Sequence, residues 1–106
     1  MRRIADDVAA LEGALAAFAG REAFVHAEWI PGGFLRNMRV EVRSAHVRGG
    51  GPYRVALRCA GEAWVRIEDV TDWDLDASGR LFLLAFGDAE QRLARTLELS
   101  PRPFPA

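Results

Sequence analysis

The sequence has 106 residues, of which 50% are hydrophobic and 27% are charged, and its formal net charge is -1. This length suits one domain with a modest core, so residues 1–106 are expected to form a single domain. The near-neutral charge argues against a strongly basic nucleic-acid-binding protein but leaves room for a local basic patch. The single cysteine, Cys59, excludes an internal disulfide and a CxxC metal site.

All basic side chains apart from the two histidines are arginines, and alanine is abundant, which together favour a bacterial genome rich in G and C. The longest apolar run, residues 81–86, is too short to cross a membrane, so no membrane contact is expected. Asp6, Asp7 and Glu12 interrupt the N-terminal segment where a signal peptide needs an apolar middle. The predicted location is therefore the cytoplasm.

Residues 3–19 are predicted to form a helix. Apolar residues recur there at spacings of three and four and draw one stripe, formed by Ile4, Val8, Leu11, Leu15 and Phe18. Gly20 is a natural stop for such a helix. The stripe is expected to cover a sheet of the same chain.

Two strands are predicted next, at about 22–30 and 35–48, with a turn at Pro31-Gly32-Gly33 between them. In the second strand the alternation of apolar and polar residues changes phase after Arg43. Such a change predicts a bulge or sharp bend near Ser44, and a strand bent in this way would curve the sheet.

The central segment is predicted to be a β-hairpin with strands at 53–60 and 63–69. Alternate residues from Tyr53 to Cys59 are apolar and are expected to point inward, which makes Cys59 a buried residue. Gly61 is able to take the positive φ that the turn requires.

The acidic stretch after this hairpin is expected to be a solvated strand end. Its Asp72-x-Asp74-x-Asp76 spacing resembles the start of a calcium-binding loop. However, Ala77 stands where that loop needs glycine, and Leu83 where it needs glutamate. No metal site is therefore assigned to it.

The last two predicted strands lie at 81–86 and 92–99. The second segment also suits a helix, with Asp88 as a possible N-cap and Gln91 three residues later. A strand is preferred because residues 81–86 need a partner. The resulting fold class is α+β: an N-terminal helix packed on a curved, mostly antiparallel sheet of about six strands, shaped as a half-barrel or cup.

Two sets of residues are candidates for a functional site. His26 and Glu28 lie two positions apart on one strand face and are a candidate acid–base pair. Six arginines lie between Arg36 and Arg58 with one acid among them, followed by an acidic stretch from Glu62 to Asp76. From these, the hypothetical binding surface consists of Arg39, Arg43, Arg54, Arg58 and Trp64.

Ordinary ion pairing of these arginines with Glu41, Glu62 and Glu68 is the simplest alternative. The sequence has no nucleophile elbow, zinc-ligand spacing or phosphate loop, so enzymatic activity is unsupported and no cofactor is implied. Residues 65–75 resemble a strand motif of small bacterial immunity-type proteins over about a tenth of the chain, too little to assign a family.

The predicted function is a non-enzymatic protein-interaction domain that acts through protein–protein contact, as a homodimer or as an immunity- or adaptor-like protein. An open sheet edge offers the route for such contact. Two alternatives remain. One is a nucleic-acid-binding module that uses an arginine-rich sheet face. The other is a small enzyme or a ligand-binding cup that uses His26, Glu28 and the arginines.

Overall fold

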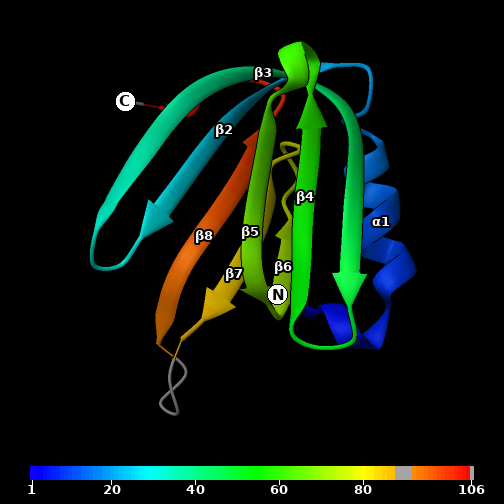
Figure 1. Cartoon of the computed structure of the whole chain (residues 1–106), viewed down its shortest axis with the longest axis vertical. Coiled ribbons are helices and arrows are strands. Elements are labelled where there is room, and N and C mark those ends of the chain that lie inside the picture. The colour runs from blue at the N-terminus through cyan, green and yellow to red at the C-terminus, as the bar shows by residue number, and fades with distance from the viewer. Residues whose placement is uncertain (88–91, 106) are drawn as a thin grey trace.

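The computed structural model describes residues 1–87 and 92–105, which contain one α-helix and eight strands (Figure 1). The helix is α1 (Val8–Ala16), preceded by a 3-10 turn at Ile4–Asp6. The strands are β1 (Arg2–Arg3), β2 (Glu22–Trp29), β3 (Gly33–Gly49), β4 (Tyr53–Cys59), β5 (Trp64–Val70), β6 (Asp72–Leu75), β7 (Leu81–Phe86) and β8 (Leu93–Ser100). None of the described residues forms a helix long and apolar enough to cross a membrane.

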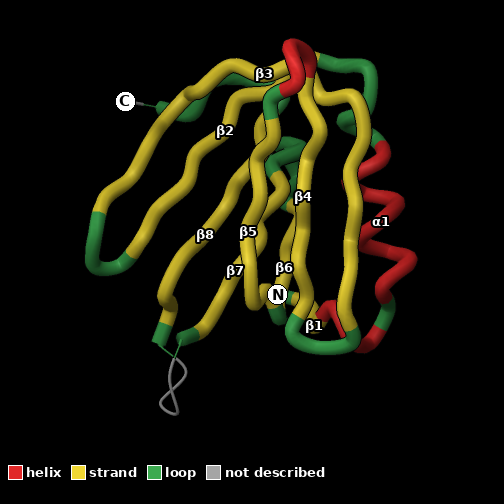
Figure 2. The backbone as a smooth tube through the Cα atoms, in the orientation of Figure 1, coloured by secondary structure: helices red, strands yellow, loops and turns green. Residues whose placement is uncertain are grey.

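The strands form one antiparallel sheet in the order β1-β6-β7-β8-β2-β3-β4-β5 (Figure 2). The sheet curves strongly around the core, and α1 packs against β3 on one side (Figure 1). These observations confirm the expectation of one helix on a curved, mostly antiparallel sheet. The strand count is eight rather than about six, because the short strands β1 and β6 were not predicted.

The α-helix is shorter than the predicted range 3–19. Arg2 and Arg3 pair with β6 as a strand, and the Asp7 side chain then accepts a hydrogen bond from the Ala10 amide at 3.1 Å. Asp7 is therefore the N-cap, and it starts the helix at Val8. The predicted apolar stripe still enters the core, with Ile4, Leu11 and Leu15 fully buried.

Strand β3 joins the two halves of the sheet. Its first half pairs with β2 and its second half pairs with β4. The β3–β4 register shifts between Val42 and Ser44, so the bulge predicted near Ser44 is confirmed.

The predicted hairpin is present as β4 and β5. Val55, Leu57 and Cys59 are buried on the inner face, and Gly61 has a φ of 75° in the connecting turn. Burial raises the pKa of the Cys59 thiol. Residues 92–99 were predicted as a strand, and β8 confirms this, whereas the alternative helix cap at Asp88 and Gln91 lies outside the described residues.

The acidic stretch is not a loose strand end. It continues as β6, separated from β5 by Thr71 alone, and pairs with β7. Near the end of β5, the register of its pairing with β4 shifts, so that Glu68 and Asp69 both lie opposite the single residue Arg54. Asp69 has a φ of 58° at this bulge. Residues 64–75 thus form β5 at one edge of the sheet and then β6, which lies next to β1 at the opposite edge.

Candidate functional site

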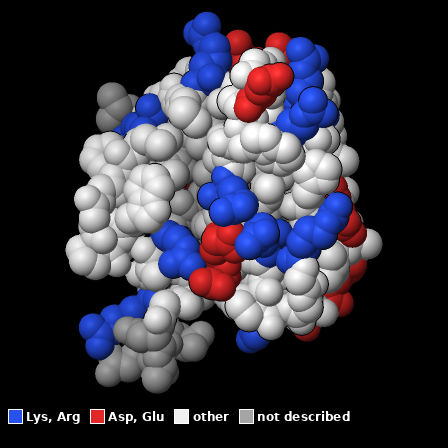
Figure 3. All heavy atoms as spheres, viewed as in Figure 1, with Lys and Arg blue, Asp and Glu red and all other residues white. Residues whose placement is uncertain are grey.

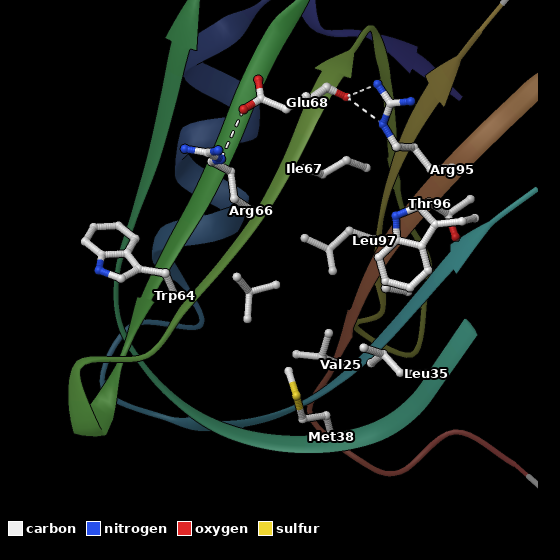
Figure 4. Close-up of a pocket in the computed structure, with 13 residues that line it drawn as sticks. Val25, Leu35, Met38, Trp64, Arg66, Ile67, Glu68, Arg95, Thr96 and Leu97 are labelled. Carbon is white, nitrogen blue, oxygen red and sulfur yellow. Dashed lines mark hydrogen bonds and ion pairs between the residues drawn. The ribbon is translucent and has the colours of Figure 1, made fainter. Parts of the chain in front are cut away.

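A cleft opens beside β5, where the curved sheet does not close. It has a volume of about 310 Å³ and lies between β5 and the inner surfaces of β2, β3 and β8 (Figure 4). Its walls are mainly apolar and comprise Val25, Ala27, Trp29, Leu35, Met38, Trp64, Val65, Arg66, Ile67, Glu68, Arg95, Thr96 and Leu97. We call this space the β5 cleft.

The free edge of β5 borders the cleft. The carbonyl of Ala63 accepts a hydrogen bond from the Cys59 amide at 2.7 Å, so it points toward β4. Backbone groups alternate in direction along a strand, and therefore Val65 and Ile67 also face β4. The backbone groups of Trp64, Arg66 and Glu68 point the other way, toward the open side.

Arg95 of β8 ties one end of this edge. Its Nε and Nη2 donate hydrogen bonds to the Glu68 carbonyl oxygen at 3.2 and 3.0 Å, and Nη2 also lies 2.9 Å from Asp69 Oδ2. The chain's passage into β6 holds the same end. The cleft consequently opens toward Trp64, where the edge groups of Trp64 and Arg66 have no strand beside them among the described residues.

Large apolar side chains are exposed in and around the cleft. Trp29 and Met38 line it and are 48% and 39% exposed, Trp64 lies at its rim with its side chain on the other side of β5 and is 58% exposed, and Phe34 near the β2–β3 turn is 65% exposed (Figure 4). Such a concentration of exposed apolar surface beside a cavity is typical of a binding site.

The predicted arginine surface is divided in the structure. Arg39 lies opposite Phe24 in the part of β3 that pairs with β2, and it is 3.6 Å from Glu22. Arg43 lies at the bulge of β3 and is 3.2 Å from Glu41. Of the four predicted arginines, only Arg54 and Arg58 therefore lie on β4, the strand next to β5, and only Arg58 lies directly opposite Trp64.

Within this smaller group, Glu68 neutralises part of the positive charge. Arg54 and Arg66 both contact its carboxylate, at 2.8 and 3.0 Å. The hydrogen bond from Arg54, with the positive charges around it, holds the pKa of Glu68 below its usual range. The predicted ion pairing across strands is thus present for Arg54 with Glu68, while Arg43 pairs with Glu41 within β3 and Arg58 has no acidic partner among the described residues. The space-filling view shows basic side chains gathered around an acidic one over the front strands (Figure 3).

His26 contacts a different carboxylate from the one predicted. Its Nε2 lies 3.6 Å from Glu98 Oε2, because Glu98 is its direct neighbour on β8. The described contacts of His26 include none to Glu28. Burial raises the pKa of Glu98, and the nearby His26 opposes this shift in part. Local sequence patterns did not indicate this pair because the two residues are far apart in the chain.

The C-terminal segment covers His26, which is only 7% exposed. The Phe104 ring centroid lies 5.7 Å from that of His26. Asn37 exchanges two hydrogen bonds with the Phe104 backbone, at 2.6 and 2.9 Å, and Arg36 donates to the Pro105 carbonyl at 3.0 Å. The His26–Glu98 pair is therefore an enclosed element beneath the tail and is separate from the lining of the β5 cleft.

The acidic residues between 68 and 76 hold structural contacts. Asp76 Oδ1 accepts hydrogen bonds from the Ser78 amide and hydroxyl and from the Arg80 amide, which lowers its pKa. Within residues 1–87 and 92–105, no group of three or more histidine, cysteine or acidic side chains is arranged to hold a metal ion.

Comparison with known proteins places the chain in a family. Residues 7–104 match the model of a family described as "Protein of unknown function (DUF1806)". The chain is 31% identical over 108 residues to the uncharacterized protein YojF of Bacillus subtilis strain 168, covering 89% of this chain and 91% of that protein. A crystal structure of Bacillus subtilis YojF matches with a TM-score of 0.80 and 27% identity, over 92% of this chain and 93% of that one. The chain belongs to the DUF1806 family.

Proposed function

We propose that the protein is a non-enzymatic interaction domain that binds a partner protein at the β5 cleft. The observation that carries this proposal is the free β5 edge next to an apolar cavity. Around Trp64 and Arg66 the edge supplies backbone donors and acceptors that pair with no strand of the described chain, and the cavity supplies space for apolar side chains. Together these are the elements of strand addition, in which an extended segment joins a sheet edge.

The side chains of β5 indicate which residue pattern the partner segment would have. Ile67 points toward the cavity, while Trp64 and Arg66 project to the other side of β5 (Figure 4). Val65, two positions before Ile67 on the strand, also lines the cavity. A strand added beside β5 would therefore place alternate residues in the apolar cavity and the others next to Arg66. Opposite charges are favoured in such cross-strand positions. The expected occupant is a short extended segment that alternates apolar and acidic residues.

The reactive groups of the chain support a binding role over catalysis. Cys59 is buried, and burial raises the pKa of its thiol, so little of it is the nucleophilic thiolate. His26 is enclosed by Phe34, Phe104 and Glu98. Neither group faces the β5 cleft. The cytoplasmic location predicted from the sequence stays a prediction.

Self-association is a second candidate for the same surface. The β2–β3 turn carries exposed apolar residues, including Trp29, Ile30 and Phe34, on the same molecule as the cleft. An antiparallel β5–β5 contact would also place Trp64 of one copy opposite Arg66 of the other. Light scattering after size-exclusion chromatography separates the candidates: a stable dimer assigns the cleft to a second copy, and a monomer leaves it to a different protein.

Hydrogen exchange tests the proposal directly. The probe is a ten-residue peptide of alternating valine and glutamate, added to the full chain. We expect slower exchange at the Trp64 and Arg66 amides, because the added strand would bond them, and unchanged exchange at Val65, which already bonds β4. A matched peptide of alternating serine and lysine is the control. Equal effects of both peptides, or no slowing at millimolar peptide, would overturn the proposal.

A further inference from the structure

The outer face of β3, β4 and β5 carries a second concave surface, which shares Trp64 and Arg66 of β5 with the rim of the β5 cleft. Val55 and Leu57 of β4 are fully buried, so the residues that alternate with them point outward. With their neighbours in register, the outward positions form a grid of nine: Ser44, His46, Arg48, Arg54, Ala56, Arg58, Trp64, Arg66 and Glu68. We call this grid the outer patch.

Ala56 makes the centre of the outer patch hollow. It lies between His46 and Arg66 in the register of the three strands, and its methyl group is the smallest side chain of the grid. Long side chains surround it, and the resulting groove has a volume of about 650 Å³, lined by His46, Arg48, Arg54, Ala56, Trp64 and Arg66. Three strands span about 10 Å, so the groove suits a small ligand.

The outer patch has an excess of positive charge. Its four arginines face one acid, Glu68, which leaves three uncompensated charges. The Glu68 carboxylate is placed on Arg54 and Arg66, at 2.8 and 3.0 Å. The described contact of the Arg48 guanidinium is to its own neighbour, the Val47 carbonyl, at 3.1 Å. Arg48 and Arg58 thus have no acidic partner within the described part of the chain and are available to bind an anion.

An aromatic platform borders the hollow. Trp64 is 58% exposed, and the His46 ring lies beside it with centroids 6.0 Å apart. Ser44 Oγ lies 3.0 Å from His46 Nε2 and fixes the histidine ring. An exposed indole next to guanidinium groups offers a stacking surface for a planar ring.

The geometry points to a nucleotide as the ligand of the outer patch, with its phosphates on Arg48 and the β4 arginines and its base on Trp64. Guanidinium forks match phosphate oxygens in pairs, and a di- or triphosphate suits an excess of three positive charges better than one carboxylate does. The planar base of the nucleotide would stack on the exposed Trp64 indole. The same chemistry is presented by a free nucleotide and by a single strand, and the test distinguishes these sources.

The test measures binding by isothermal titration calorimetry at 50 and 200 mM salt. The probes are adenosine triphosphate, inorganic triphosphate and a five-residue oligodeoxyadenylate. We expect adenosine triphosphate to bind more tightly than triphosphate, and the higher salt to weaken both. Tighter binding of the oligonucleotide than of adenosine triphosphate would support the proposal and assign the source to a single strand.

Three variants locate the site. Ala56→Leu fills the hollow and leaves every charge in place, while the double variant R48Q/R58Q removes two charges without leaving an acid unpaired. Each is expected to lower affinity for adenosine triphosphate about tenfold, equivalent to about 1.4 kcal/mol. Arg39→Gln also removes one positive charge, but at a site outside the outer patch, and it is expected to leave the affinity for adenosine triphosphate unchanged.

Any one of three results would overturn the inference. One is the absence of binding to all three probes in the unaltered protein at millimolar concentration. Another is an equal loss of affinity in Arg39→Gln and R48Q/R58Q with none in Ala56→Leu, which indicates attraction to the overall charge rather than to this hollow. A glutamate-rich peptide that binds as tightly as adenosine triphosphate would also overturn it.

Discussion

Arg95 of β8 donates two hydrogen bonds to the carbonyl oxygen of Glu68 on β5, at 3.2 and 3.0 Å. This contact joins two strands that are not neighbours in the sheet. Together with the chain's continuation into β6, it fixes one end of the β5 cleft and leaves the other end open.

Replacing Arg95 with alanine is expected to loosen the cleft. The variant loses bonds from a charged donor to a carbonyl, and since the arginine is partly exposed we expect a loss of about 1 to 2 kcal/mol in unfolding free energy. Urea denaturation measures the loss, and hydrogen exchange should quicken along β5. Arg102→Ala, in the C-terminal segment, is the control. Equal stability of the two variants would contradict the bracing role of Arg95.

Proline substitutions at adjacent positions of β5 test the direction of its backbone groups. Val65→Pro removes a ladder hydrogen bond to β4 and is expected to cost about 2 kcal/mol or more. Arg66→Pro removes an amide that faces the open side and is expected to cost less than about 1 kcal/mol, as edge positions tolerate proline. Thermal and urea unfolding compare the two. A larger loss in Arg66→Pro would show that the assigned orientation of β5 is wrong.

The Arg66→Pro variant also tests the proposed binding of a partner strand beside β5. It should abolish the slowed exchange at Trp64 that the valine–glutamate peptide produces, because the added strand loses its amide partner. Arg66→Gln keeps that amide and should retain the effect.

Glu98 predicts an unusual pH dependence. Burial raises its pKa, and the nearby Glu28 adds to this, while His26, Thr96 and Arg36 oppose it. The folded protein therefore holds this proton more tightly than the unfolded chain, whose glutamates titrate near about 4.3. This group's contribution to stability is present below that pH and is lost as the pH rises through the raised pKa.

The variant Glu98→Gln should lack that loss. Glu68 and Asp76 have lowered pKa values and act with the opposite sign, since their contribution is lost as the pH falls. They are common to both proteins, so the difference between the two stability curves isolates Glu98. Urea unfolding from pH 4 to 8 measures it, with NMR titration of the carboxyl carbon as a direct check. A constant difference over this range would be inconsistent with a raised pKa.

Asn37 has two separable roles that a pair of variants can resolve. Its side chain holds Phe104, and its backbone has a φ of 58°, which costs alanine more than glycine. Asn37→Ala and Asn37→Gly both lose the bonds to Phe104. We expect alanine to be the less stable by about 1 kcal/mol in urea unfolding. Both variants should shift the His26 ring resonances, since Phe104 leaves that ring. Unshifted resonances would show that the tail stays in place without Asn37.

Local patterns predicted much of this fold. Alternation located the β4–β5 hairpin, and the change of phase near Ser44 located the bulge in β3, because both signals lie within a few neighbouring residues. The apolar stripe of the helix was also correct, although Asp7 starts the helix later than expected.

Contacts between distant segments were beyond these patterns. Residues 72–75 look like a polar strand end, and they become β6 only because β7 lies beside them. Similarly, Glu98 meets His26 because β8 pairs with β2, and Arg95 meets Glu68 because the curved sheet brings β8 close to β5. The arginine surface was only partly located for the same reason, as β3 divides its length between two partner strands.

The central place of β8 has a consequence for synthesis of the protein. Ala27 and Leu97 are direct partners although they lie 70 positions apart, and β8 separates β2 from β7 in the finished sheet. On the ribosome, β2 and β7 thus have one bare edge each until residues 93–100 emerge. Contacts of such long range form slowly, and bare edges invite aggregation. The middle of the sheet is therefore complete only when β8 has joined β2 and β7.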